Sequence, residues 1–118
     1  MQHIFFNLDG DFQSVSSSVF SALGVGIPCE GDSSNVLNGV YYSHSIFGLN
    51  LKLERNSYDY EDRYAYMLSV TEDPQARIES NDQIAELCSS IVVKLLAMNL
   101  GIVLARETLT GLELSERE

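Results

Sequence analysis

Residues 39–70, GVYYSHSIFGLNLKLERNSYDYEDRYAYMLSV, carry the side-chain alternation that decides the fold of this chain. Residues 40–46 are rich in aromatic and β-branched side chains, and Gly48 marks a turn after them. In residues 49–55 three leucines alternate with polar side chains, and residues 64–70 alternate again. A period of two is typical of strands with one buried and one wet side. We therefore predict an antiparallel meander of three strands.

A strand and a helix are predicted before this meander. Residues 3–8 form a short apolar run, and residues 12–23 place apolar side chains at helical spacing. Asp11 or Asp9 is the expected N-cap of this helix, and Gly24 is its expected stop. The turn-rich stretch that follows, up to the meander, is expected to be irregular.

A second helix is predicted after the meander, from the capping-box pair Ser80 and Gln83 to about Asn99. Its apolar stripe is so broad that the helix is expected to be largely buried against the sheet. The stripe consists of Ile84, Leu87, Cys88, Ile91, Val92, Val93, Leu95, Leu96 and Met98. Residues 102–105 are predicted to form the last strand.

The order along the chain is β-α-β-β-β-α-β, which indicates an α+β fold with a mostly antiparallel sheet packed against two helices. The chain has 118 residues and lacks a linker that would divide it, so residues 1–118 are expected to form a single α+β domain.

Charge is the strongest global signal. Seventeen Asp and Glu against seven Lys and Arg give a formal net charge of -10. Such a chain is repelled by nucleic acid and by anionic membranes and is attracted to a basic protein. The alternative is that the charge only provides solubility. No apolar run approaches the roughly 20 residues of a membrane span, and no signal-peptide pattern opens the chain, so a cytoplasmic location is expected.

Sites for catalysis, metals and cofactors find little support in the sequence. Residues 3–12, HIFFNLDGDF, look like the opening motif of haloacid-dehalogenase-type phosphatases, but Asn7 stands where the nucleophilic Asp would be. His44 could in principle pair with a serine or with Cys29, but it is expected to lie in a strand, where a lone His is more often exposed or hydrogen-bonded than a base, and His3 lies near the terminus. Cys88 lies in an apolar helical pattern and is expected to be a buried thiol. We therefore expect no enzyme, no metal site and no cofactor.

The densest unusual segment is residues 54–66, where four tyrosines and four acids fall within thirteen residues. Tyrosine offers a large contact area with a polar tip, and acids pair with Arg and Lys of a basic surface. The predicted partner-binding residues are Glu54, Tyr58, Asp59, Tyr60, Glu61 and Asp62. Tyr64 and Tyr66 are expected in the core beside Leu68. The alternative for this loop is a solvated turn whose tyrosines fold back on the sheet.

A small acidic α+β chain with an SYDYED loop and no catalytic set resembles bacterial immunity proteins, especially those of contact-dependent growth inhibition systems. The resemblance lies in this overall character and in residues 39–70. It implies a cytoplasmic protein that binds a basic toxin domain and blocks its nuclease or other activity. The alternative is a non-enzymatic adaptor or homo-oligomeric module, and the sequence leaves the oligomeric state open.

Overall fold

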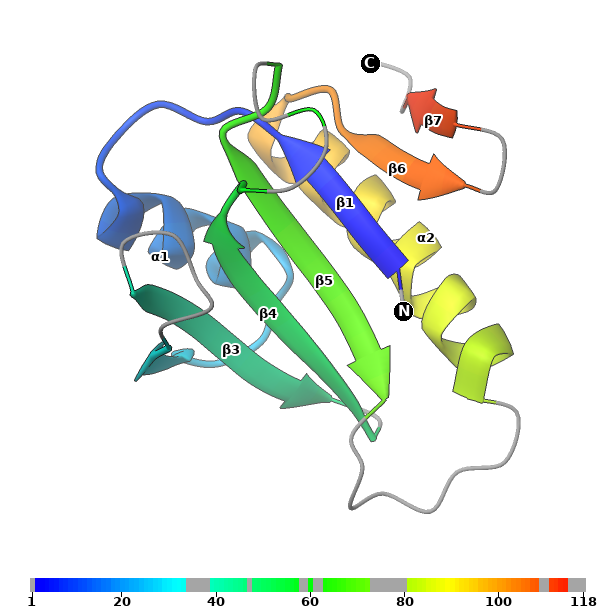
Figure 1. Ribbon diagram of the computed structural model, residues 1–118, viewed down its shortest axis with the longest axis horizontal. Coiled ribbons are helices and arrows are strands. Elements are labelled where there is room, and N and C mark those ends of the chain that lie inside the picture. The colour runs from blue at the N-terminus through cyan, green and yellow to red at the C-terminus, as the bar shows by residue number, and fades with distance from the viewer. Residues whose placement is uncertain are drawn as a thin grey trace.

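The computed structural model describes residues 2–33, 39–46, 48–57, 60, 63–72, 81–108 and 111–114 (Figure 1). In this part of the chain the strands form one antiparallel sheet, in the order β2-β3-β4-β5-β1-β6-β7. The strands are β1 (Gln2–Phe6), β2 (Cys29–Asp32), β3 (Val40–Ile46), β4 (Leu49–Arg55), β5 (Tyr66–Glu72), β6 (Ala105–Thr108) and β7 (Gly111–Leu114). The helices are α1 (Phe12–Ala22) and α2 (Asn81–Leu100). The predicted α+β class is confirmed.

The predicted meander is present as β3, β4 and β5. The bounds of β3 and β4 are those expected from the alternation. Strand β5 begins later, at Tyr66, because the ladder with β4 ends at the pair Arg55 and Tyr66. Tyr64 therefore lies in the β4–β5 connection, where its backbone N–H donates to the carbonyl oxygen of Tyr60 at 2.9 Å.

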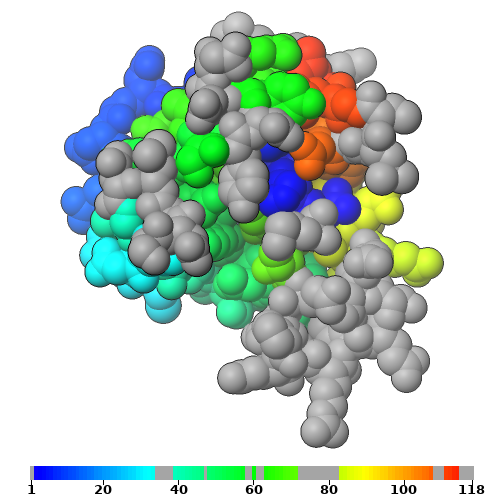
Figure 2. All heavy atoms as spheres, viewed as in Figure 1, coloured from blue at the N-terminus to red at the C-terminus, as the bar shows by residue number. Residues whose placement is uncertain are grey.

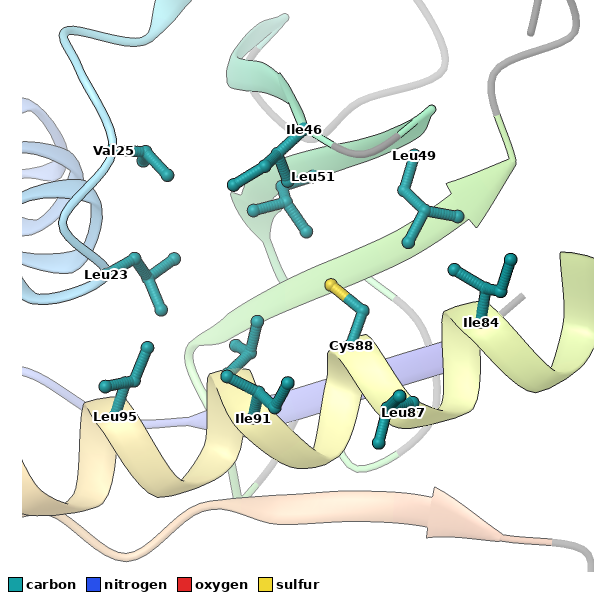
Figure 3. A pocket seen from close by; sticks show the side chains of 11 residues that line it. Leu23, Val25, Ile46, Leu49, Leu51, Ile84, Leu87, Cys88, Ile91 and Leu95 are labelled. Carbon is teal, nitrogen blue, oxygen red and sulfur yellow. The ribbon is translucent and has the colours of Figure 1, made fainter. Parts of the chain in front are cut away.

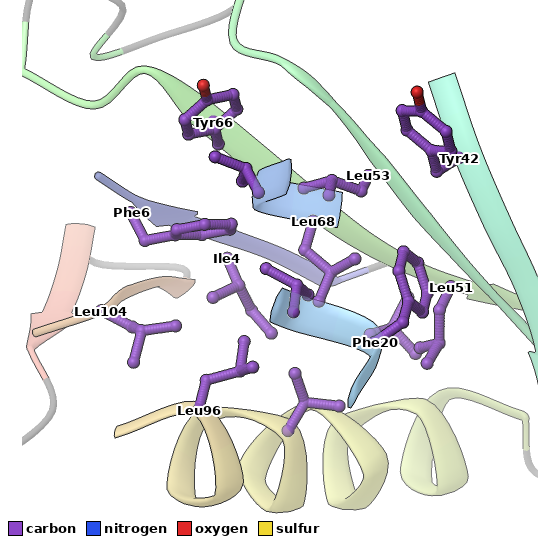
Figure 4. Close-up of a cluster of buried hydrophobic side chains, with 14 of the residues drawn as sticks. Ile4, Phe6, Phe20, Tyr42, Leu51, Leu53, Tyr66, Leu68, Leu96 and Leu104 are labelled. Atoms are coloured by element: carbon purple, nitrogen blue, oxygen red, sulfur yellow. The ribbon is translucent and has the colours of Figure 1, made fainter. Parts of the chain in front are cut away.

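The two faces of the sheet bury different clusters. The face toward the helices holds the main core, whose largest members meet between the sheet and α2 (Figure 4). They include Ile4, Phe6, Phe20, Leu51, Leu53, Leu68, Leu96 and Leu104. Tyr66 belongs to this core as predicted. Tyr64 does not, and packs instead on a small cluster of Phe5, Met67 and Ala105 on the opposite face.

Helix α1 follows the predicted caps. The carboxylate of Asp11 accepts a hydrogen bond from the backbone N–H of Ser14 at 2.8 Å, and this bond lowers the pKa of Asp11. The helix ends at Ala22 with Leu23 as its C-cap, and Gly24 follows with a φ of 72°. A positive φ suits a residue without a Cβ, so Gly24 is the predicted stop.

Helix α2 is less buried than its sequence predicts. A single row of side chains at helical spacing is buried, namely Ala85, Ser89, Val92 and Leu96. Leu87, Ile91 and Met98 are 64%, 50% and 67% exposed. The reason is geometric, because a helix lying on a sheet buries one stripe and the apolar residues of α2 are spread over a wider arc. Ser80, the predicted cap, lies outside the described residues.

Part of α2, the window Gln83–Leu100, is long and apolar enough to cross a membrane by length and composition alone. The sequence shows no long unbroken apolar run here, because Glu86, Ser89, Ser90 and Lys94 interrupt the window. In the fold, 22% of the window is buried. Its buried row packs on β5 and β1, so α2 serves as a core helix with one uncovered side.

Two edge strands were not expected from the sequence. Strand β2 falls in the stretch read as irregular, because its sequence CEGD has no apolar alternation and its pairing with β3 is what makes it a strand. Within β2, a Cβ at position 31 would lie 2.3 Å from the ring of Tyr41, so any residue other than glycine would clash with that ring as it now lies. Strand β7 is the other edge, paired with β6. The last predicted strand, 102–105, begins instead at Ala105, whose partner is Phe5.

Candidate partner-binding surface

The connection between β4 and β5, residues 56–65, holds most of the predicted partner-binding residues. Four of them, Tyr58, Asp59, Glu61 and Asp62, lie outside the described residues. The other two, Glu54 and Tyr60, are described, together with the residues on both sides of the gap. The geometry of these flanks determines how the connection is held.

Glu54 lies near the end of β4 and is 5% exposed. Its carboxylate is 3.5 Å from the ammonium group of Lys52, which is itself one-third exposed. With so little surface, Glu54 offers a partner few contacts. Its ion pair with Lys52 lies within β4, whereas the sequence had predicted Glu54 as part of the contact surface.

Tyr60 is half-buried and folds back toward the sheet. Its ring meets the ring of Phe5 edge-on, with centroids 5.6 Å apart. Its carbonyl oxygen accepts hydrogen bonds from the backbone N–H groups of Arg63 and Tyr64, both at 2.9 Å. Its φ is 64°, a strained value for a residue with a side chain, which persists only where the surroundings fix it. The connection is therefore tied down at its centre.

Two asparagine side chains fix the second half of the connection. Asn7, directly after β1, donates from Nδ2 to the carbonyl oxygen of Arg63 and accepts at Oδ1 from the N–H of Ala65, both at 2.8 Å. Asn56 donates from its backbone N–H to the carbonyl oxygen of Ala65 at 2.8 Å and from Nδ2 to that of Tyr64 at 3.0 Å. A carboxamide supplies a donor and an acceptor together, which suits it to clamp a backbone.

Sequence reasoning missed the role of Asn7 because its two partners lie 56 and 58 residues away. The only available signal was its position, immediately after a strand and before an N-capped helix. The clamp means that the flanks of the tyrosine-rich loop are ordered before a partner arrives. Such pre-organisation reduces the entropy cost of binding.

The open face of the sheet lies beside this connection. Figure 2 views the molecule from this side and shows β1 in blue next to β6 in orange. The ammonium group of Lys52 lies 4.7 Å from the ring centroid of Tyr41.

Nδ1 of His3 lies 3.2 Å from the hydroxyl of Ser69, and hydrolases use pairs of this kind, in which a histidine activates a serine. Ser69 is only 6% exposed, however, so the contact joins β1 to β5.

A hollow lies on the side of the sheet that the helices cover. It is an apolar groove of about 280 Å³ between α2, the end of α1 and the β3–β4 strands (Figure 3). Its lining consists of Leu23, Val25, Ile46, Leu49, Leu51, Ile84, Leu87, Cys88, Ile91, Val92 and Leu95. The side chain of Cys88 points from α2 toward the sheet in Figure 3. We refer to this hollow as the α2 groove.

The two cysteines should differ in reactivity. Cys29 is exposed on β2, whereas Cys88 is half-buried in the α2 groove, where burial raises the pKa of its thiol. A higher pKa leaves less thiolate at a given pH, and the thiolate is the reactive form. We expect N-ethylmaleimide at pH 8 to modify Cys29 several-fold faster than Cys88, as measured by peptide mass spectrometry. Equal rates in the folded protein would contradict the placement of Cys88.

No family model, no curated protein and no solved structure matches this chain. Among the described residues, no three His, Cys, Asp or Glu side chains are grouped as a metal site would require. The β4–β5 connection and the α2 groove are thus interpreted from their own geometry. The described residues of the connection and the α2 groove each provide aromatic or apolar area, which is typical of surfaces that recognise proteins.

Proposed function

We propose that this chain is an immunity protein that binds and neutralises a basic bacterial toxin domain, most simply a nuclease. The observation that supports it best is that the described residues of the β4–β5 connection are held in place: Tyr60 packs on Phe5, and Asn7 and Asn56 clamp the backbone of residues 63–65. The net charge of -10 supplies the attraction to a basic partner. The resemblance to immunity proteins of contact-dependent growth inhibition systems points the same way.

In this proposal, Tyr58 and Tyr60 provide contact area, and Asp59, Glu61 and Asp62 pair with Lys and Arg of the toxin. A nuclease holds its substrate with cationic groups, so an acidic surface can occupy the same site. Opposite charges speed the encounter, and salt screens them, so association should slow as ionic strength rises. The chain itself performs no chemistry in this role.

The first test is to identify the toxin. Co-expression of the chain with the product of the gene immediately upstream should give a complex that co-purifies, and the chain should rescue cells from that product. Absence of both binding and rescue for neighbouring candidate toxins would contradict the proposal.

Charge reversal tests the site. The variant Asp59→Lys, Glu61→Lys, Asp62→Lys should weaken toxin binding at least tenfold and flatten its salt dependence, because rim charges steer association. The matched control is Asp32→Lys, Glu86→Lys, Glu107→Lys, which makes the same change in net charge on β2, α2 and β6. Isothermal titration at two salt concentrations measures both. If the control loses as much affinity as the site variant, net charge rather than this connection determines binding.

The alternative of a homo-oligomeric module is favoured by one observation. Leu87, Ile91 and Met98 are exposed on α2, and such side chains are typical of interfaces when they are contiguous. Light scattering of the purified chain distinguishes the alternatives. A stable oligomer without any partner would favour the homo-oligomeric module.

A further inference from the structure

We propose that the α2 groove is a docking site for an amphipathic helix of a basic protein. This site is separate from the β4–β5 connection, which packs on Phe5 on the opposite face of the sheet. It therefore does not depend on the proposed immunity function. The inference rests on the shape of the groove, the spacing of apolar residues along α2 and the charge of the chain.

The shape of the groove follows from how the two helices meet. Asn99, near the end of α2, donates from Nδ2 to the carbonyl oxygen of Ala22, the last residue of α1, at 2.8 Å. Beyond this contact, the groove is lined by α2 on one side and by Leu23 and Val25 on another (Figure 3). Leu49 and Leu51 close its floor and are almost fully buried. A cavity of roughly 150 Å³ holds a benzene-sized group, so 280 Å³ accommodates about two large apolar side chains.

The spacing along α2 indicates that these two side chains come from a helix. Beside the buried row that faces the sheet, α2 carries a second apolar row with 4-3-4-3 spacing. This row consists of Ile84, Cys88, Ile91, Leu95 and Met98. Four of its five members line the groove. Such spacing is the seam that one helix presents to another, and apolar anchors of a bound helix recur at i, i+3 or i+4, and i+7. Asn99, the residue after this row, donates the hydrogen bond that joins α2 to the last residue of α1.

The charge of the chain indicates a basic partner rather than a second copy. Two copies would each bring a net charge of -10 to the interface, whereas a basic helix is attracted from a distance. Among the described side chains of α2, those with a charge are Glu86 and Lys94, which are exposed and do not line the groove, so the attraction arises from the net charge of the chain as a whole. The occupant is therefore expected to be apolar on the face it inserts and rich in Lys or Arg on its outer face.

Cys88 provides a direct reporter of occupancy. In a Cys29→Ser background it is the remaining thiol, and it lies in the groove lining. The probe is a synthetic helical peptide of leucine and lysine with leucine at 4-3-4-3 spacing. At saturation it should slow alkylation of Cys88 by roughly tenfold or more. Two control peptides are a scrambled one of the same composition and one with glutamate in place of lysine; neither should protect Cys88.

A pair of matched variants locates the binding. Ile91→Glu and Ile27→Glu each add one negative charge at an exposed isoleucine, but only Ile91 lines the groove. The dissociation constant of the leucine-lysine peptide should rise at least tenfold for Ile91→Glu and should stay within about twofold for Ile27→Glu. Leu87→Gln, an uncharged change in the same groove, should weaken binding in the same direction. Circular dichroism verifies that each variant is folded.

Three results would overturn the inference. Equal protection by the scrambled peptide would show attraction to charge alone, without docking. Equal protection by the glutamate peptide would refute a basic partner. Protection of Cys88 that rises with protein concentration, in the absence of peptide, would assign the groove to a second copy. None of these results bears on binding at the β4–β5 connection.

Discussion

Replacing Phe6 with alanine is expected to lower the free energy of unfolding by about 3–5 kcal/mol, the usual cost of removing a buried phenylalanine. Phe6 is fully buried in β1, the strand that pairs with both β5 and β6. Its ring stacks on that of Tyr66 with centroids 5.7 Å apart (Figure 4). Truncation leaves a cavity where the sheet meets its helices. Since domains of this size have a free energy of unfolding of only about 5–15 kcal/mol, this loss would be a large fraction of it.

Urea denaturation followed by circular dichroism measures this change. The matched control is Ile27→Ala, which removes an apolar side chain that is 93% exposed and should shift stability by no more than about 0.5 kcal/mol. A loss below about 1.5 kcal/mol for Phe6→Ala would contradict a central position for β1. A similar loss for Ile27→Ala would show that the exposed residue is packed.

Asn7→Ala should have the second largest effect on stability, a loss of about 1–3 kcal/mol. The variant removes both hydrogen bonds that tie the β4–β5 connection to the end of β1, and each is worth about 1 kcal/mol. The backbone N–H of Ala65 loses its acceptor. We therefore expect its amide to exchange with solvent faster, by about tenfold, while amides in the middle of β5 change less.

Hydrogen exchange read by mass spectrometry or NMR tests the clamp, and two variants sharpen it. Asn7→Asp keeps an acceptor for the N–H of Ala65 but places a carboxylate against the carbonyl oxygen of Arg63, so it should restore little of the lost stability. Asp9→Ala changes an exposed residue two positions after Asn7, between β1 and α1, and should leave exchange at Ala65 unaltered. Unchanged exchange in Asn7→Ala would show that the clamp does not hold the connection.

Patterns of local spacing were sufficient for much of the fold. The alternation in residues 40–46 and 49–55 predicted β3 and β4 with their bounds, and Asp11 and Gly24 predicted the ends of α1. These features depend on neighbours in the chain, namely the period of the side chains and the caps. Strand β2 lacks such a pattern and exists because β3 pairs with it.

The candidate site was predicted only in part. Composition located the tyrosines and acids of residues 54–66, but burial separates Glu54 from the rest. Nor did spacing reveal that Asn7 holds the connection, because no local rule relates an asparagine to a backbone more than fifty residues away. The apolar stripe of α2 was visible in the sequence. Which part of it would remain uncovered was not, because that depends on which side of α2 packs on β5 and β1.

By itself, then, the sequence determined both helices, the central strands, the α+β class and the strong negative charge, since each follows from residue type and short-range spacing; the edge strands β2 and β7 did not follow from it. Tertiary structure alone decided the order of strands, the clamp formed by Asn7 and the uncovered side of α2. The physical reason is that these depend on contacts between segments far apart in the chain. Hydrogen-bond pairing and burial select those contacts only when all the elements pack together.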